Sequence, residues 1–286
     1  MNSERSRLIG IAYRMLGSYS DAEDAASEAL LRWYRLTDAE RDAIDVPRAW
    51  LTRVVGRICL DLLGSARVRR EHYVGQWLPE PVRALATGDD GTSDPADRVA
   101  LHESVGLALL VVLDSLSPAE RVAFVLHDAF AVPFDDIANV LGRTPAACRQ
   151  LASAARRRVH DDRRGPSAPN THDRVVRAFV AAAAGGDLDA LVALLAPDIT
   201  LVSDGGGRVS AARNPVRGAD RVARFVLGIT VKSTDLDRSI ESVNGLTGVV
   251  LRRHGVVTGV IGFRTDSAVV TDVWIVLNPE KLRHWS

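Results

Sequence analysis

Arginine and amide side chains gather on one predicted helix, at a spacing that suits contact with nucleic acid. Arg149, Gln150 and Ser153 point away from the apolar side of this helix. An arginine guanidinium can pair with guanine edges, a glutamine amide can pair with adenine, and arginines further along can meet phosphates. The residues predicted to contact DNA, which include the N-terminal turn of the helix, are Thr144, Pro145, Ala146, Arg149, Gln150, Ser153, Arg156 and Arg157.

The elements that must position these side chains form a predicted helix-turn-helix. A short helix spans Phe134 to Leu141, Gly142 supplies a permissive backbone for the turn, and Thr144 caps a second helix with Pro145 in its first turn. The inward side of the second helix is expected to be Cys148, Leu151, Ala155 and Val159. The alternative is a basic amphipathic helix in an ordinary bundle, but capping, turn and charged face together favour the helix-turn-helix.

A second arginine cluster lies on and after a helix predicted to begin at Pro47. Arg53 and Arg57 are four residues apart and therefore share one face of that helix. Two separate arginine clusters on helices, with acidic residues elsewhere, favour a binding role over a merely solvated face. Trp50 and Tyr73 could stack on an unpaired base, although Trp50 also lies beside the apolar stripe and suits the core. The members of the cluster are Arg53, Arg57, Arg67, Arg69 and Arg70.

Acidic residues are segregated from these clusters, although the whole chain is neutral. It holds 36 Lys and Arg residues against 36 Asp and Glu residues, which excludes a uniformly basic nucleic-acid coat but not local patches. Ser20 and Glu23 form a predicted capping box at the start of a helix. The carboxylates of that helix suit a basic partner, or they are solvated acids favoured by the helix dipole. They are Asp21, Glu23, Asp24 and Glu28.

The periodicity of apolar residues divides the chain into several parts. Residues 1–70 read as helices, and residues 71–97 read as a linker punctuated by proline and glycine. The linker contains Trp77-Leu78-Pro79-Glu80-Pro81, which either docks on the nearest helix or recognises another part of the molecule. Residues 98–164 read as helices again, with a capping box at Ser117 and Glu120. The chain of 286 residues is therefore predicted to be multidomain.

The C-terminal part, residues 173–286, has a different pattern. Two helices are predicted near Asp173–Ala184 and Asp187–Leu195, and another near Ala219–Leu227. Strand-like runs are Ile199–Ser203, Ser239–Val243, Gly248–Arg252, Val256–Arg264 and Ala268–Val276. Helices followed by a meander of strands indicate an α+β domain with an antiparallel, curved sheet.

Several classes of site are disfavoured by composition. Cys59 and Cys148 each fall in an apolar helical pattern and are expected to be reduced core thiols, not metal ligands. No metal-spaced cluster, no phosphate-binding loop lysine and no cofactor motif occurs. The N-terminus lacks the apolar core of a signal peptide, and no apolar run reaches about 20 residues, so we expect a cytoplasmic protein with no membrane contact.

The helical parts resemble the extracytoplasmic-function sigma factors of bacterial RNA polymerase. Ser117 to Arg121 and the helix-turn-helix look like their promoter-recognition domain four, and Tyr19 to Trp33 looks like the core-polymerase-binding helix of domain two. Ala49 to Leu63 looks like the following helix, which in the family carries promoter melting and minus-ten recognition. The resemblance implies that the arginine cluster on and after this helix meets promoter phosphates or the displaced strand. The resemblance implies core RNA polymerase and promoter DNA as partners. It also implies a core-binding surface made of Asp21, Glu23, Asp24, Glu28, Leu31 and Trp33.

Three further motifs resemble those of the subgroup with a fused SnoaL-like domain. They are Trp77 to Pro81, Asp204 to Arg208 and Asn278 to Leu282. The resemblance implies a cone-shaped α+β barrel for residues 173–286 that acts as a built-in regulator by docking on the linker. The residues expected to make this contact are Trp77, Leu78, Pro79, Asp204, Gly205, Arg208, Asn278, Pro279, Lys281 and Leu282.

Two other functions remain open from the sequence. A conventional helix-turn-helix regulator with a ligand-binding barrel would act without core polymerase, but it would not need the first helical part. A catalytic barrel would need an acid or base inside its cavity. Asp198, Asp204, Asp272 and His254 are the polar candidates, but Asp204 suits a turn before three glycines and His254 suits a hairpin turn. We therefore expect no catalytic residues, and at most a small-molecule ligand in the barrel.

Overall fold

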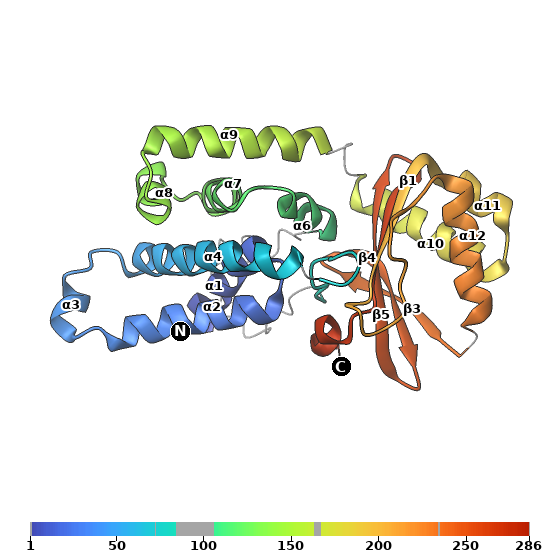
Figure 1. Ribbon diagram of the computed structural model, residues 1–286, viewed down its shortest axis with the longest axis horizontal. Helices are drawn as coiled ribbons and strands as arrows, with labels where there is room; N and C mark the ends of the chain where they lie inside the picture. The colour runs from blue at the N-terminus through green and yellow to red at the C-terminus, as the bar shows by residue number, and fades with distance from the viewer. Residues whose placement is uncertain (1, 72, 84–105, 163–166, 234, 286) are drawn as a thin grey trace. The chain divides into compact units, whose positions relative to one another are not determined.

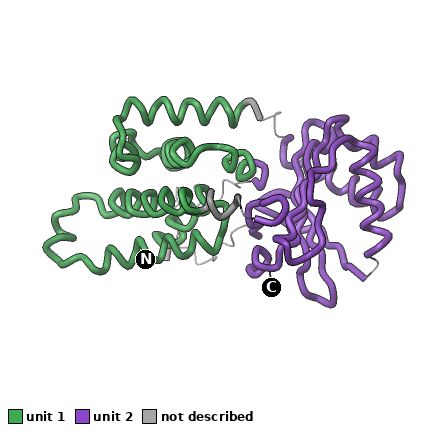
Figure 2. The backbone as a smooth tube through the Cα atoms, viewed as in Figure 1, with its two compact units in different colours: residues 1–71, 86–103, 109–162 green, residues 72–85, 104–108, 163–286 purple. Residues whose placement is uncertain are grey.

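The computed structural model describes residues 2–71, 73–83, 106–162, 167–233 and 235–285, without the side chains of residues 2, 66–71, 161 and 162. The described chain forms two compact units (Figure 2). Residues 2–71 and 109–162 belong to the first unit. Residues 73–83, 106–108 and 167–285 belong to the second, so part of the predicted linker is grouped with the C-terminal domain.

The first half of the first unit is a set of four helices (Figure 1): α1 (Asn2–Leu16), α2 (Tyr19–Arg35), α3 (Asp38–Asp42) and α4 (Pro47–Glu71). Small residues let α2 approach α1 closely, because Ala22, Ala25 and Ala29 are buried against a core that includes Leu8 and Ile11. The predicted cap of α2 is wrong by two residues. Its N-cap is Ser18, whose hydroxyl accepts a hydrogen bond from the Asp21 amide at 3.1 Å.

The second half of the first unit contains α6 (Leu107–Asp114) from Leu109 onward, α7 (Pro118–Phe124), a π-helical turn η1 (Val125–Ala129), α8 (Phe134–Leu141) and α9 (Pro145–Asp162). The capping box at Ser117 is confirmed. The Glu120 carboxylate accepts from the Ser117 amide at 3.0 Å, and the Ser117 hydroxyl accepts from the Glu120 amide. Gly56 of α4 brings this helix against α8, since a Cβ there would lie 3.3 Å from Val140 Cγ1.

The second unit is an α+β domain with one six-stranded sheet. Its strands are β1 (Leu195–Asp204), β2 (Val216–Arg217), β3 (Asp237–Val243), β4 (Leu246–Arg253), β5 (Val256–Asp266) and β6 (Val269–Val276). The strand order is β2-β1-β6-β5-β4-β3, so the sheet has two edges and is not a closed barrel. The strand pairs are antiparallel, as expected, except that β1 and β6 are parallel. Between them the chain crosses to the far edge, and the meander then returns β6 to the side of β1.

Helices cover one face of this sheet: α10 (Pro169–Gly185), α11 (Leu188–Ala193) and α12 (Ala219–Lys232) (Figure 1). The core between them includes Val176, Phe179, Val222 and Phe263. The opposite face is buried as well. Val250, Val260 and Val276, which point away from the helices by strand alternation, are all fully buried. Residues 73–83 and the 3₁₀ helix η2 (Pro279–Trp285) complete this unit.

The two cysteines are buried free thiols, as the sequence predicts. Burial raises the pKa of both Cys59 and Cys148. Each thiol therefore stays protonated near neutral pH and behaves as a small apolar core group. In the part of the chain that the structure describes, no helix is both long enough and apolar enough to cross a membrane.

Candidate nucleic-acid interface and the Asp204 cluster

The helix-turn-helix is present over the predicted residues. Gly142 adopts the left-handed conformation with φ 62° at the end of α8, which lets the chain turn without strain. The Thr144 hydroxyl then accepts a hydrogen bond from the Ala147 amide at 3.2 Å and so caps α9. The turn and the cap together fix where the second helix, α9, begins.

The α9 helix has one buried and one exposed face. Cys148, Ala155 and Val159 are buried as predicted, but Ala152 takes the inward position expected for Leu151, which is half-buried. Most residues on the opposite face of α9 are exposed to solvent, so this face is accessible to a binding partner. The predicted contact residues that are exposed are Thr144, Ala146, Arg149, Gln150, Arg156 and Arg157, while Pro145 and Ser153 are half-buried.

Two of the exposed arginines have partners within the unit. The Arg156 guanidinium donates to the Asp128 carboxylate at 2.6 Å, and the Arg149 guanidinium lies 5.6 Å from the centre of the Phe134 ring. Surface ion pairs of this kind contribute little to stability. They hold each guanidinium in place on the surface of this unit.

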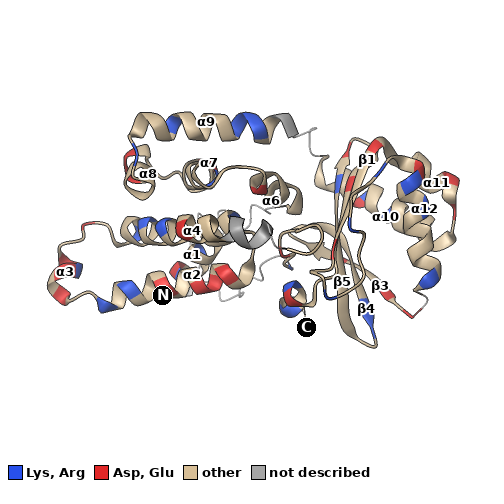
Figure 3. Cartoon of the chain, in the orientation of Figure 1, with Lys and Arg blue, Asp and Glu red and all other residues tan. Residues whose placement is uncertain are grey.

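The second arginine cluster lies partly along α4 (Figure 3). Arg57 is exposed, and Arg53 is half-buried with its guanidinium 4.0 Å from the Asp136 carboxylate of α8. The side chains of Arg67, Arg69 and Arg70 lie outside the described residues. The first helix of the helix-turn-helix therefore faces the helix that carries the second cluster.

The helix α2 carries acidic residues along its length (Figure 3). Asp24 is exposed, whereas Asp21, Glu23 and Glu28 are half-buried, and Glu28 accepts from Arg32 at 2.8 Å. Leu31 is 49% exposed, and Trp33 packs edge-to-face on Trp50 with 5.4 Å between the ring centres. This contact assigns Trp50 to packing.

Tyr34 was missed from the sequence. It is 47% exposed on α2, near the equally exposed Leu31. The helical spacing of three residues between them was the available signal. Together they form an apolar spot beside the carboxylates.

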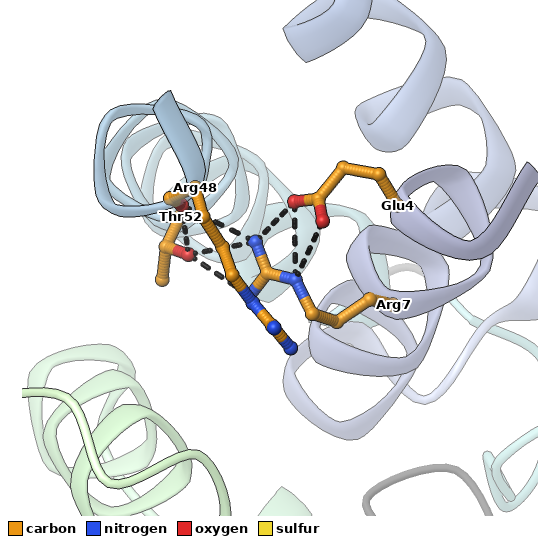
Figure 4. A network of polar contacts seen from close by, with 4 residues as sticks. All are labelled: Glu4, Arg7, Arg48 and Thr52. Carbon is orange, nitrogen blue, oxygen red and sulfur yellow. Dashed lines mark hydrogen bonds and ion pairs between the residues drawn. The ribbon is translucent and has the colours of Figure 1, made fainter. Parts of the chain in front are cut away.

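A buried arginine fixes α4 against α1 (Figure 4). Arg7 is 5% exposed and donates to the Thr52 hydroxyl at 3.0 Å and to the Arg48 carbonyl at 3.2 Å. Its charge is paired with Glu4 of the same helix. This network sets the position of the helix that carries Arg53 and Arg57, and sequence periodicity gave no sign of it.

The most completely bonded polar group in the second unit is the Asp204 carboxylate, at the end of β1. Asp204 is fully buried, and four donors reach its two oxygens. Oδ1 accepts from the Tyr73 hydroxyl at 2.6 Å and from the Gly206 amide at 3.0 Å. Oδ2 accepts from the Leu78 amide at 2.9 Å and from Lys281 Nζ at 2.6 Å. The bond from the Gly206 amide is the contact of a turn aspartate, as the sequence predicts, but the bonds from Tyr73, Leu78 and Lys281 show that the carboxylate also joins distant segments.

The residues around this carboxylate form what we call the Asp204 cluster: Tyr73, Trp77, Leu78, Asp204, Asn278 and Lys281. The Asn278 amide donates to the Tyr73 hydroxyl at 2.9 Å. Lys281 Nζ lies 4.2 Å from the centre of the Trp77 ring and also donates to the Leu78 carbonyl. Burial and the bond to Asp204 raise the pKa of Tyr73, so its hydroxyl keeps the proton that it donates.

The remaining residues of the three motifs have different positions. Pro79 and Leu282 are buried, whereas Pro279 is exposed, and Arg208 pairs with Glu280 at 2.5 Å on the surface. Gly205 is buried, and a Cβ there would lie 2.4 Å from the Val209 carbonyl oxygen. At Gly206, a Cβ would lie 2.3 Å from Asn278 Nδ2. The glycine run is thus required by close packing beside Asp204.

An apolar cavity of about 80 Å³ lies on the helix-covered face of the sheet. Its lining includes Phe179, Val226, Leu251 and Phe263, and among the residues that the structure describes its only polar side chains are Thr230 and Arg238. None of the four acid or base candidates lines it. Asp272 pairs with Arg264 at 2.7 Å, His254 lies in the β4–β5 turn, and Asp198 is exposed. Across the described residues, no group of His, Cys, Asp and Glu side chains could hold a metal ion.

Comparison with known proteins agrees with this division of the chain. Residues 1–69 match the model of sigma-70 region 2, residues 106–159 match sigma-70 region 4, and residues 176–278 match the SnoaL-like domain. The ECF RNA polymerase sigma factor SigJ of Mycobacterium tuberculosis (strain ATCC 25618 / H37Rv) is 43% identical, over 97% of this chain and 90% of SigJ. This chain belongs to the ECF RNA polymerase sigma factors.

Other relatives support this membership of the sigma factor family. The probable ECF sigma factor SigI of M. tuberculosis (strain CDC 1551 / Oshkosh) is 36% identical, over 98% of this chain and 92% of SigI. The crystal structure of M. tuberculosis SigJ superposes with a TM-score of 0.77 at 40% identity, covering 98% of this chain and 96% of that chain. The resemblance found in the sequence, including the fused SnoaL-like domain, is confirmed.

The SnoaL-like match in this sigma factor stops short of the domain's physical limits. It ends at residue 278, but Lys281 and Trp285 of η2 are buried in the same unit. Residues 73–83 lie far outside the match as well, yet the Trp285 indole donates to the Pro81 carbonyl at 2.8 Å. The folded domain of this sigma factor therefore includes a segment that the chain places directly after region 2.

Proposed function

We propose that this sigma factor directs core RNA polymerase to its promoters through three separate helical surfaces. The carboxylates of α2, with Leu31 and Trp33, bind the core enzyme. The exposed face of α9 reads the upstream promoter element, and the arginines of α4 meet the downstream element. Work on chromosomal promoters would place the protein in the cytoplasm.

The exposed face of α9 is the observation that carries the DNA-binding part of this proposal. Arg149, Gln150 and Arg157 are exposed on a helix that is capped and held on a left-handed glycine turn. A recognition helix in the major groove needs such a face, with its first turns aimed at base edges. Transcription in vitro with core polymerase tests the proposal. Initiation that depends on promoter sequence is expected, and its absence at every candidate promoter would refute it.

We further propose that the SnoaL-like domain regulates the sigma regions by holding residues 73–83. Asp204 is buried with four donors, and two of these come from Tyr73 and Leu78. Removing one partner of a buried ion pair lowers stability far more than disturbing an exposed pair does. We therefore expect the contact between Asp204 and residues 73–83 to be either intact or lost. Holding this segment limits the positions that the chain after region 2 can adopt. The domain thereby sets how the two DNA-binding regions are presented.

Transcription by altered chains tests this regulatory role. We would compare the full chain with a chain that ends near Gly165 and with Tyr73→Phe, which removes one hydrogen bond to Asp204. Both are expected to change promoter-dependent transcription relative to the full chain. Arg224→Gln, at an exposed pair on α12, is the matched control. Equal transcription by all four proteins would refute the regulatory role and leave the sigma activity intact.

The cavity supports a second, non-catalytic role for the same domain. Its lining has no carboxylate or histidine, so it lacks the acid or base that catalysis would need. Cavities lined by apolar side chains stay dry and can bind small apolar molecules. Arg238 adds positive charge at the lining, so we propose a short alkyl carboxylate as the ligand class.

Hexanoate is a suitable probe for the cavity. In methyl NMR spectra of the full chain, hexanoate is expected to shift the resonances of Val226, Leu251 and Ile275 more strongly than hexanol does. Arg238→Gln should abolish the difference between the acid and the alcohol. Unchanged spectra at millimolar hexanoate would refute the ligand-binding role.

A further inference from the structure

Leu107, the first residue of α6, is buried on the sheet of the SnoaL-like domain. Its side chain is 4% exposed. The Leu107 side chain occupies space that is open because residue 262 of β5 is a glycine. A Cβ at Gly262 would lie 2.8 Å from Leu107 Cδ2. The neighbours Ile261 and Phe263 line the cavity on the helix-covered face. By strand alternation, Leu107 therefore sits on the opposite face.

The residue before Leu107 approaches the same sheet. A Cβ at Gly106 would lie 3.4 Å from Leu246 Cδ1, at the start of β4. The match to sigma-70 region 4 begins at residue 106. Region 4 therefore starts on the surface of the SnoaL-like domain.

The segment after region 2 ends on the same hairpin. The Asn244 amide donates to the Val82 carbonyl at 2.7 Å, and the Val82 amide donates to the Asn244 side-chain carbonyl at 3.1 Å. Asn244 has φ 50° in the turn between β3 and β4, two residues before Leu246. Val82 and Gly106, the two ends of the tether between the sigma regions, thus contact one β-hairpin.

We infer that the SnoaL-like domain holds the tether at both ends, and that Leu107 on Gly262 is a second anchor. The consequence for promoter spacing rests on the proposed function. The 23 residues between Val82 and Gly106 could span at most about 80 Å when extended. Because both ends of the tether are bound to one hairpin, the length of the tether cannot increase the distance between region 2 and region 4.

The two anchors have different strengths. The anchor after region 2 includes a buried ion pair, several hydrogen bonds and the Trp285 indole bond to Pro81. In the described part of the chain, the anchor before region 4 consists of the Leu107 side chain packed over Gly262 and the approach of Gly106 to Leu246. The region 4 end is therefore the first to be released, and the region 2 end stays on the domain.

Hydrogen exchange of the free full-length protein tests the second anchor. Leu107→Ala removes the side chain, and Gly262→Val fills its place. Gly228→Val on α12 is the control, because a Cβ there meets no atom within 4 Å. Peptides covering residues 106–114 should exchange at least tenfold faster in both variants, with residues 73–83 and the control unchanged.

Two results would overturn the inference. The first is an exchange rate in Leu107→Ala that equals the wild-type rate. Because Leu107→Ala changes no residue of the sheet, this variant remains informative even if Gly262→Val unfolds the domain. The second is exchange in the Leu107→Ala, Gly262→Val double variant that is faster than in the wild type by the product of the two single effects, because residues sharing one contact should not act independently.

The polymerase consequence has its own measurement. On templates whose promoter elements are moved apart by two base pairs, Leu107→Ala should retain a larger share of its transcription than the wild type does. If both proteins lose the same share of their transcription, the spacing role is refuted. The hydrogen-exchange result would still test the anchor by itself. Failure of the proposed function is distinct, because the wild type would then initiate at no promoter.

Discussion

The exposed face of α9 and the Asp204 cluster use the same charged chemistry in opposite surroundings. On α9, Arg149 and Arg157 stand in water on a single helix. In the cluster, Asp204 and Lys281 lie 77 positions apart, are buried, and are joined at 2.6 Å. Charges in water can exchange partners at little cost, whereas a buried pair must stay together. The first arrangement suits binding to an external partner, and the second suits a contact within the chain.

The largest expected effect concerns the buried pair. Asp204→Asn removes the anion and leaves the Lys281 ammonium buried without its counter-charge, so the free energy of unfolding of the second unit should fall by about 3–5 kcal/mol. Denaturant unfolding followed by tryptophan fluorescence measures the change. Asp220→Asn, at an exposed pair with Arg224, is the control and should leave stability unchanged. Equal stability of both variants would mean that the cluster does not hold the segment.

The exposed face should respond through binding and not through folding. Arg149→Ala is expected to weaken specific promoter binding by the polymerase holoenzyme by about 1–3 kcal/mol, since a bidentate contact to a base edge is lost. Competition binding with base-substituted promoters measures this, and Arg174→Ala on α10 is the matched control. Unchanged promoter preference would exclude Arg149 from base contact.

The corrected cap of α2 allows a smaller and sharper comparison. Ser18→Ala should lower the free energy of unfolding by about 1 kcal/mol, because the Asp21 amide loses its acceptor. Ser20→Ala, inside the first turn, should change it by less than about 0.5 kcal/mol. Thermal unfolding of the two variants decides between the caps, and the reverse order of effects would restore the sequence-based assignment.

The smallest effect is expected from a buried histidine. His172 is 3% exposed, donates from Nε2 to the Thr247 carbonyl at 2.9 Å, and accepts at Nδ1 from the Thr265 hydroxyl. Burial lowers the pKa of His172, so the unfolded chain takes up a proton more readily than the folded one.

The sign of the pH dependence follows from this difference. The contribution of His172 to stability should be complete above about pH 6.5, the ordinary histidine pKa, and should decline as the pH falls below it. Unfolding experiments between pH 7.5 and pH 5 on the wild type and His172→Gln measure it. Parallel profiles for the two proteins would contradict the expectation.

The helical parts were predictable to a large extent because their signals are local. The capping box at Ser117, the turn at Gly142 and the alternation of Arg149 with Cys148 each depend on residues within about one or two turns. The errors in these parts are also local. Ser18 and Ser20 are both good caps, and only the backbone path after Gly17 selects Ser18.

The C-terminal domain was harder because its decisive contacts are distant in sequence. Individual strands were found by alternation, but the parallel pairing of β1 and β6 depends on the path of α12. Tyr73 was assigned to base stacking, whereas its hydroxyl is held by Asp204 and Asn278, more than 130 positions away. Periodicity carries no information about such pairs.

The sequence by itself determined the helices, the turn of the helix-turn-helix and the segregation of charge, since these follow from backbone propensity and spacing within a few turns. Tertiary structure alone decided which charges are buried, that residues 73–83 complete the SnoaL-like domain, and that Leu107 rests on Gly262. The physical reason is that burial and close approach depend on what packs against a residue, and those neighbours come from far along the chain.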